Sequence, residues 1–309
     1  MNILSRPPLE ENPTESTHNP DWAGLIHECL INIFSRLPLE DRWKGAMLVC
    51  KPWMEACQDS PLINNSFDLE CYFETYTDSA HWWTPEFESK IDAILISAVN
   101  LSYGLLKRIR VSHCSDHALI FAAQRCPKLE VLSIKSSQSV SDATIIEVSK
   151  RCPLLKELDM SFCHKITYIS FPSIGRNCPR LKLLKRNFMN LQDSSQYRGI
   201  VPNEYIDACP QGFDSEAAAI AGSMPNLLSI DLMNSGLSGK GLALISEGCL
   251  NLETLDLRGC DNLSTQNLIS VLPLDGGSSN VEGSEVLCGL PIAVRTSWTH
   301  ENPGRRFKT

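Results

Sequence analysis

The side chains of this sequence best suited to bind a metal ion are its cysteines and histidines. The 309 residues include 13 Cys and 7 His, and His113-Cys114, Cys114 with His117, and Cys163-His164 stand close together. A zinc site needs two close pairs of such ligands that converge on one tetrahedron. Several of these cysteines recur instead at regular intervals along the chain, so we expect a ladder of small buried thiols and no metal ion.

Short motifs for other chemistry are absent. The chain contains no G-x-x-x-x-G-K, G-x-G-x-x-G, G-x-S-x-G or H-E-x-x-H string, so neither a phosphate-binding loop nor a nucleophile on a sharp turn is indicated. No cofactor is expected. A catalytic site assembled from distant residues leaves no short string, and such an enzyme remains an alternative.

The overall charge argues against general binding of nucleic acid. Lys and Arg number 28 and Asp and Glu 36, which gives a net charge of −8 and a pI near 5.4. No apolar run is long enough to predict a membrane span, and residues 1–20 lack the apolar stretch of a secretion signal. With an odd number of scattered cysteines, we expect reduced thiols and a location in the nucleus, the cytoplasm or both.

A repeated pattern dominates the elements that must position any functional side chain. CPKLEVLSI begins at Cys126, CPLLKELDM at Cys152, CPRLKLLKR at Cys178, MPNLLSIDL at Met224 and CLNLETLDL at Cys249, with a weaker copy, YGLLKRIRV, at position 103. Apolar residues fall mainly three, six and eight positions after the first residue of each copy, and the last two alternate with polar ones as in a strand. The pattern predicts six copies of one supersecondary unit.

The second half of each unit predicts a turn and a helix. A Cys recurs eleven positions after the first residue in three copies, and a Ser or Thr then precedes an apolar stretch with helical spacing. Such hydroxyls accept hydrogen bonds from the first turn of a helix. The predicted N-caps are Ser115, Ser141, Thr167, Ser238 and Ser264.

This period resembles the cysteine-containing leucine-rich repeats, and it covers residues 103–272. The resemblance implies an α/β solenoid, a leucine-rich-repeat horseshoe in which one parallel sheet lies inside a row of convex helices. An insertion at about residues 189–212 breaks the period, and we expect it to project as a mobile loop and to take part in target capture through Tyr197, Arg198 and Tyr205. A disordered excursion without a binding role is the alternative. Residues 273–309 show no repeat and are expected to form a C-terminal tail.

Residues 21–57 have a denser apolar pattern, which predicts a small all-α module. An amphipathic helix is expected over 25–37, a second over 39–50 and a third over 52–57. So few residues enclose little interior, and we therefore expect part of the apolar surface to meet a partner.

These residues resemble the F-box of plant F-box proteins with leucine-rich repeats. The resemblance rests on LIHECL from Leu25, IFSRLP from Ile33, LVCK from Leu48 and Trp53, although Ile26 replaces the usual Pro. It implies docking on the SKP-type adaptor of an SCF-type cullin-RING ubiquitin ligase, with Ile33, Leu37 and Leu48 equally suited to the internal core. The adaptor-binding residues implied are Leu25, Ile26, Glu28, Ile33, Leu37, Pro38, Leu48, Val49 and Trp53.

The expected domains are a disordered tail at 1–20, the F-box at 21–66, and a connecting segment at 67–102 before the repeats. In the connecting segment, Thr84-Pro85-Glu86 predicts the start of a helix that runs to Val99 and caps the solenoid core. We expect Trp82 and Trp83 to be buried at that cap.

The resemblance implies a non-catalytic subunit that bridges the adaptor, and through it a cullin, to a target protein for ubiquitination. Polar strand residues that point away from the core are the predicted target-binding set: Glu157, Asp159, Lys185, Asp231, Asp256 and Arg258. A merely solvated strand face would show the same pattern, and a leucine-rich scaffold that is not coupled to a ligase is the alternative function. The sequence does not identify the target.

Overall fold

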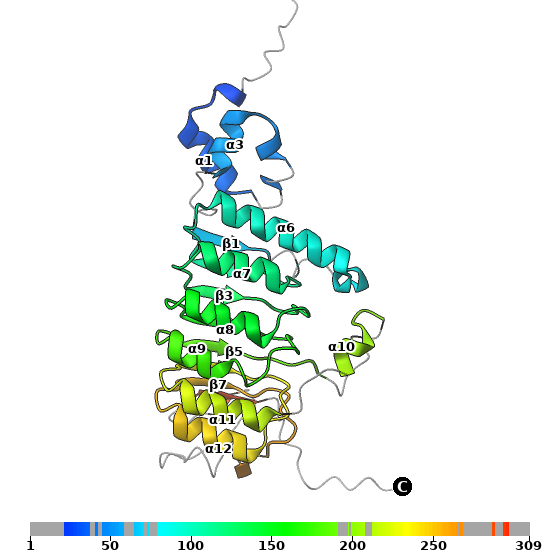
Figure 1. Ribbon diagram of the computed structural model, residues 1–309, viewed down its shortest axis with the longest axis vertical. Helices are drawn as coiled ribbons and strands as arrows, with labels where there is room; N and C mark the ends of the chain where they lie inside the picture. Colours follow the sequence, from blue (N-terminus) through cyan, green and yellow to red (C-terminus); the bar gives the residue numbers. More distant parts are fainter. Residues whose placement is uncertain are drawn as a thin grey trace, which may run out of the picture. The chain divides into compact units, whose positions relative to one another are not determined.

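A computed structural model (Figure 1) describes residues 22–37, 41–42, 45–58, 65–70, 73, 79–190, 197, 199–207, 212–264, 266–267, 286–287 and 293–296. The chain divides into two compact units, Met1–Cys57 and Gln58–Thr309. The division falls a few residues before the expected end of the F-box at 66. Among the described residues, no helix is long and apolar enough to cross a membrane.

The first unit is helical. It contains the 3-10 helix η1 (Trp22–Gly24), α1 (His27–Ser35), the 3-10 helix η2 (Ala46–Leu48) and α3 (Lys51–Gln58), which extends one residue into the second unit. Its buried core consists of Leu30, Phe34, Ala46, Ala56 and Cys57.

Two of the predicted helices in this unit differ from those observed. The first is shorter than predicted at both ends: Ile26 is its N-cap, and its carbonyl accepts hydrogen bonds from the Cys29 and Leu30 amides. The second, predicted over 39–50, is wrong as one continuous helix, because Ala46–Leu48 form a 3-10 turn. Gly45 precedes that turn, where a Cβ would lie 2.7 Å from the Asp41 carbonyl oxygen. Such a close approach does not occur in a regular helix, so the chain departs from one continuous helix at Gly45.

One sheet runs through the second unit. Its parallel strands have three residues each: β1 (Ser66–Asp68), β2 (Arg108–Arg110), β3 (Val131–Ser133), β4 (Glu157–Asp159), β5 (Leu183–Lys185), β6 (Ser229–Asp231), β7 (Thr254–Asp256) and β9 (Ala293–Arg295). β8 (Val286–Leu287) pairs antiparallel with β9. The sheet follows sequence order from β1 to β7, and it extends one parallel strand beyond each end of the predicted repeats.

Helices stack on one face of this sheet (Figure 1). They are α6 (Pro85–Leu101), α7 (Asp116–Arg125), α8 (Asp142–Arg151), α9 (Phe171–Asn177), α11 (Phe213–Ser223) and α12 (Gly239–Gly248). The 3-10 helix η3 (Ala80–Trp83) and α6 follow β1, and Trp82 and Trp83 are buried there as predicted. The side chain of Thr84 caps α6, and Pro85 lies in its first turn, so the predicted start of this helix is confirmed. The predicted α/β solenoid, one parallel sheet with convex helices, is confirmed.

Apolar residues from strand and helix meet between the two layers. The middle residue of every repeat strand points into this core and is buried, as Ile109, Leu132 and Leu158 show. The cysteines form two rows: the thiol of Cys178 donates to the Cys152 carbonyl, 3.6 Å away, and that of Cys163 donates to the Ile134 carbonyl, 3.0 Å away. Each thiol thus joins one repeat to the one before it.

Carboxylates at the convex helices provide a second link between repeats. Asp142 of α8 accepts hydrogen bonds from the backbone amide of Thr167, at 2.9 Å, and from its hydroxyl, at 2.7 Å. The same pair of bonds recurs in Asp92 with Ser115, Asp116 with Ser141, and Asp214 with Ser238. We call these contacts Asp clamps. In each Asp clamp, a carboxylate of the preceding repeat accepts a hydrogen bond from a backbone amide just before the next helix.

The Asp clamps correct the expected capping roles. Ser115, Ser141 and Ser238 do occupy N-cap positions, but only the Ser238 side chain also accepts a bond from its own helix, from the Lys240 amide. Thr167 is not an N-cap, because α9 begins at Phe171 and its N-cap is Ser170. The hydroxyl of Ser264 accepts from the Asn267 amide, as a cap would.

Between α9 and α11 a buried ion pair joins the layers. Arg186 occupies a core position that holds Ile134, Met160, Leu232 and Leu257 in the repeats that begin at Cys126, Cys152, Met224 and Cys249. Its guanidinium donates to the carbonyls of Met160, Cys163 and Ile166. It also lies 3.1 Å from the buried Glu216 carboxylate of α11. Three carbonyls and one carboxylate thus satisfy a charge that would otherwise destabilise the core.

Replacement of Asp142 by Ala should destabilise the solenoid. Two hydrogen bonds to a carboxylate are lost, so we expect the free energy of unfolding in urea to fall by about 2 kcal/mol. The matched control is Asp261→Ala, at an exposed residue, where the expected change is within about 0.5 kcal/mol. Equal effects of the two substitutions would show that the Asp clamp does not stabilise the fold.

The buried thiols should resist alkylation in the folded protein. Burial raises the pKa of Cys163 to about 12, whereas Cys29 is exposed, and the thiolate is the reactive species. At pH 8, iodoacetamide should modify Cys29 within minutes and Cys163 only after unfolding, as measured by mass spectrometry of peptides. Comparable labelling of both in the folded chain would contradict the buried ladder.

Candidate functional site

The first unit carries an apolar groove of about 490 Å³. It is lined by residues of η1, α1, η2 and α3 and of the turns beside them: Trp22, Leu25, Leu30, Ile33, Phe34, Leu37, Gly45, Ala46, Val49 and Trp53. The indole nitrogen of Trp53 donates to the Trp22 carbonyl, 3.1 Å away, and the Trp53 ring packs on Phe34 with ring centroids 5.0 Å apart. One wall of the groove is therefore fixed by packing and by a hydrogen bond.

Five of the predicted adaptor-binding residues line this groove: Leu25, Ile33, Leu37, Val49 and Trp53. Three others lie exposed outside its lining: Ile26, Glu28 and Leu48. Pro38 lies outside the described residues. Leu48 and Val49 are 76% and 60% exposed, so this unit leaves large apolar side chains in solvent. Trp22 also lines the groove and was not predicted. The available signal was an aromatic residue shortly before an amphipathic helix.

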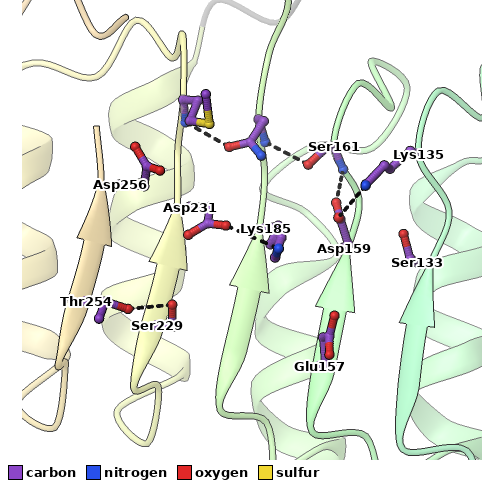
Figure 2. A network of polar contacts seen from close by, with 12 residues as sticks. Ser133, Lys135, Glu157, Asp159, Ser161, Lys185, Ser229, Asp231, Thr254 and Asp256 are labelled. Atoms are coloured by element: carbon purple, nitrogen blue, oxygen red, sulfur yellow. Dashed lines mark hydrogen bonds and ion pairs between the residues drawn. The ribbon is translucent and has the colours of Figure 1, made fainter. Parts of the chain in front are cut away.

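The second unit has a polar strand face opposite its helices (Figure 2). Its charges form ion pairs across the strands. Arg110 of β2 reaches past β3 to Glu157 of β4, at 2.9 Å, and neighbouring repeats are joined by Lys135 with Asp159 at 3.8 Å and Lys185 with Asp231 at 3.6 Å. Figure 2 shows the latter two pairs side by side across β3 to β6. This row of alternating charge offers both signs to a polar partner.

The six predicted target-binding residues all lie on or beside this face, and they differ in accessibility. Asp159 and Asp256 are buried, and Arg258 folds back on Asp256 with a nitrogen–oxygen distance of 2.7 Å. Glu157, Lys185 and Asp231 are half-buried. Burial raises the pKa of Asp231, as do Asp256 and Asp159, while Lys185 opposes the rise.

Glu70 also belongs to this face, and its carboxylate pairs with Arg110 and Lys135. It was not predicted, because the strand before it was not predicted.

The insertion does not simply project from the solenoid, which corrects that expectation for its described residues. Its helix α10 (Asn203–Asp207) places a buried Tyr205 ring on His164, with centroids 4.2 Å apart and planes 8° apart. His164 Nδ1 donates to the Tyr205 carbonyl at 2.7 Å, and Trp83 packs on the same ring at 4.6 Å. Tyr197 is half-buried, and Arg198 lies outside the described residues.

An aromatic row continues from this contact toward the first repeat. Trp83 meets His113 edge-on at 5.0 Å, and His113 also packs near Phe73 and Phe87. Burial lowers the pKa of His113 to about 4, so its imidazole is neutral near pH 7. The row joins the insertion, the cap and the first repeats through ring contacts.

No group of three or more His, Cys, Asp or Glu side chains within the described part of the chain could hold a metal ion.

The comparisons with known proteins agree with this architecture. Residues 27–67 match the F-box-like family and residues 151–168 match a Leucine Rich repeat family. The chain is 52% identical to Arabidopsis thaliana F-box protein SKIP1 over 81% of its length and 82% of that protein. The chain therefore belongs to the F-box proteins with leucine-rich repeats, and the resemblance to plant members is confirmed.

Two further matches place it among these relatives. It is 53% identical to the putative F-box/LRR-repeat protein 19 of Arabidopsis thaliana, over 81% of this chain and 82% of that one. The putative F-box/LRR-repeat protein 23 is 31% identical over 79% of this chain and 49% of its own length. Among solved structures, the C-terminal domain of tropomodulin from Caenorhabditis elegans matches 52% of this chain and 92% of its own with a TM-score of 0.34 and 15% identity.

Acidification should destabilise the second unit through its buried imidazoles. Since the pKa of His113 is lower in the folded chain than in the unfolded one, the unfolded state binds more protons between about pH 4 and 6.5, and stability falls as the pH drops through that range. From pH 7 to 5, one such group removes about 2 kcal/mol.

The test is His113→Asn, because Asn does not titrate here and tolerates the left-handed backbone of this residue, whose φ is 57°. In urea unfolding, the variant should lose about 2 kcal/mol less than the wild type between pH 7 and pH 5. The same pH dependence in both proteins would contradict a neutral buried His113.

Proposed function

We propose that this chain is the target-recognition subunit of an SCF-type ubiquitin ligase. In this proposal the first unit binds the SKP-type adaptor, and through it a cullin, and the leucine-rich unit holds a target protein for ubiquitination. Membership of the F-box family supports the adaptor as partner. The single observation that carries the proposal is the apolar groove and the exposed side chains beside it.

The apolar surface of the first unit suits a permanent protein partner. Ile26, Leu48 and Val49 are each at least 60% exposed, and the groove beside them is lined almost wholly by carbon atoms. Burial of one such side chain in an interface is worth about 1.5 to 3 kcal/mol. Fully packed apolar anchors at the centre of an interface dominate its binding energy.

The leucine-rich unit supplies a different kind of surface. Its strand face offers charges of both signs, held in place by ion pairs between the strands. A target with complementary charges would be positioned by them, and specificity would follow from the match of sign and spacing. A subunit of this kind contributes proximity and orientation, so it needs no catalytic residue of its own. We place it in the nucleus, the cytoplasm or both.

Leu48→Asp should weaken adaptor binding without unfolding the chain. Leu48 is 76% exposed, and the loss of its burial together with a new charge should lower the affinity for a purified SKP-type adaptor by about 30-fold or more in calorimetric titration. The matched control is Leu250→Asp, at a leucine of the second unit that is 81% exposed.

Both variants should keep the circular dichroism and urea midpoint of the wild type. Adaptor affinity unchanged in Leu48→Asp, or reduced equally in both variants, would count against the groove and the exposed side chains beside it as the docking surface. Failure of the wild-type chain to bind the adaptor at all would favour a scaffold that is not coupled to a ligase.

A further inference from the structure

A small pocket lies at the carboxyl end of the first repeat strands. It has a volume of about 160 Å³. We call it the edge pocket; its described lining residues are Glu70, Phe73, Trp82, Ser112, His113, Lys135, Ser136 and Phe162. They come from the turns after β1, β2, β3 and β4 and from η3. The pocket is thus separate from the groove of the first unit.

Its position follows from a backbone feature of the repeats. The third residue after each of five strands is left-handed, with φ of 57° at His113, 54° at Ser136, 61° at Phe162, 55° at Asn234 and 73° at Gly259. The first three of these residues line the edge pocket. Such backbone favours glycine, as at Gly259, yet His113 and Phe162 place rings there. Those two rings become walls of the pocket.

The charges of the pocket are already paired with each other. Lys135 Nζ lies 3.4 Å from a Glu70 carboxylate oxygen, and Ser133 donates to the other oxygen of that carboxylate. Arg110 lies 3.6 Å from the same group. The lining therefore offers no unpaired carboxylate for a cationic guest, and a second cation would be repelled by Lys135 and Arg110.

One buried polar atom in the lining is unsatisfied. His113 is 4% exposed, and its Nδ1 has no hydrogen-bond partner among the described residues. A buried polar group without a partner destabilises the structure, so such an atom beside a pocket calls for a ligand atom. A hydroxyl both donates and accepts, and it would satisfy either tautomer of the imidazole.

We propose that the edge pocket binds a tyrosine side chain of the target protein. A cavity of about 150 Å³ holds one benzene ring, which matches the volume of about 160 Å³ here. Phe73, Trp82 and Phe162 provide ring faces and edges for aromatic contacts. The phenol hydroxyl supplies the partner that His113 lacks. The proposal rests on the proposed function, because it names what the leucine-rich unit recognises.

Direct binding is tested with p-cresol, which is the tyrosine side chain without its backbone. The full chain, labelled with 5-fluorotryptophan, shows six tryptophans in fluorine NMR, and Trp82→Phe assigns the resonance of Trp82. Saturable movement of that resonance is expected, with a dissociation constant on the order of 1 mM for so small a ligand. Toluene, which lacks the hydroxyl, should bind at least about 5-fold more weakly, and n-butylammonium should not move the resonance.

The matched variants are Phe162→Gly and Tyr168→Ala. Glycine removes one wall of the pocket and suits the left-handed backbone at that residue, so the fold should be retained. Tyr168 is an aromatic residue that is 47% exposed and outside the pocket lining. Phe162→Gly should weaken p-cresol binding at least about 5-fold, and Tyr168→Ala should leave it unchanged.

Selection from a random displayed peptide library connects the pocket to protein targets. The wild-type chain should enrich peptides with tyrosine at one fixed position, p-cresol should compete with them, and Phe162→Gly should not enrich them. An unmoved Trp82 resonance, toluene or n-butylammonium binding as tight as p-cresol, or enriched peptides without tyrosine would overturn the proposal. Both variants should bind the adaptor as tightly as the wild type does. If the wild-type chain itself does not bind the adaptor, the proposed function is refuted whatever the p-cresol experiments show.

Discussion

A repeat of this solenoid cannot bury its strand and helix alone, and this constraint governs the second unit. Each strand has three residues and finds its hydrogen-bond partners only in neighbouring repeats. The Asp clamps extend the same dependence to the helices, because the amide ahead of a helix is satisfied by the preceding repeat. Backbone, thiol and carboxylate contacts thus join the same pairs of neighbours. Every functional surface of the unit depends on this stacking, because each is assembled from several repeats.

The buried Arg186 is the most unusual element of the stack. It stands where the period calls for an aliphatic side chain, three residues before the insertion, and it binds turn carbonyls together with Glu216 of the helix that follows the insertion. A guanidinium can donate hydrogen bonds to several acceptors at once, which a leucine side chain cannot do. Removal of either partner would leave the other charge buried and unpaired. The ion pair thus links the repeat that the insertion interrupts to helix α11 after the insertion.

Much of the fold followed from local patterns in the sequence. The alternation around Leu132 and Leu158 predicted the strands, and Thr84-Pro85 predicted a helix start, because each signal depends on a few adjacent residues. β1 and β9 were not predicted, because three residues are too few to show an alternating pattern by themselves. The other strands were recognised because the same pattern recurs from repeat to repeat. The candidate groove was largely anticipated through the F-box resemblance. Glu70 and the edge pocket were not, because side chains more than sixty positions apart meet there only once the repeats stack.

The contact of the insertion with the cap has a consequence for the order in which the chain folds. Many contacts between neighbouring repeats join residues some 23 to 29 positions apart, as in the bonds of Ser115 and Cys163, so these repeats can assemble in the order of their synthesis. Tyr205 on Trp83 closes a far longer loop, whose closure entropy rises with length. Such a closure is slow and becomes favourable only when both ends are already structured. We therefore expect the tyrosine to dock late, onto an N-terminal half of the solenoid that is already folded.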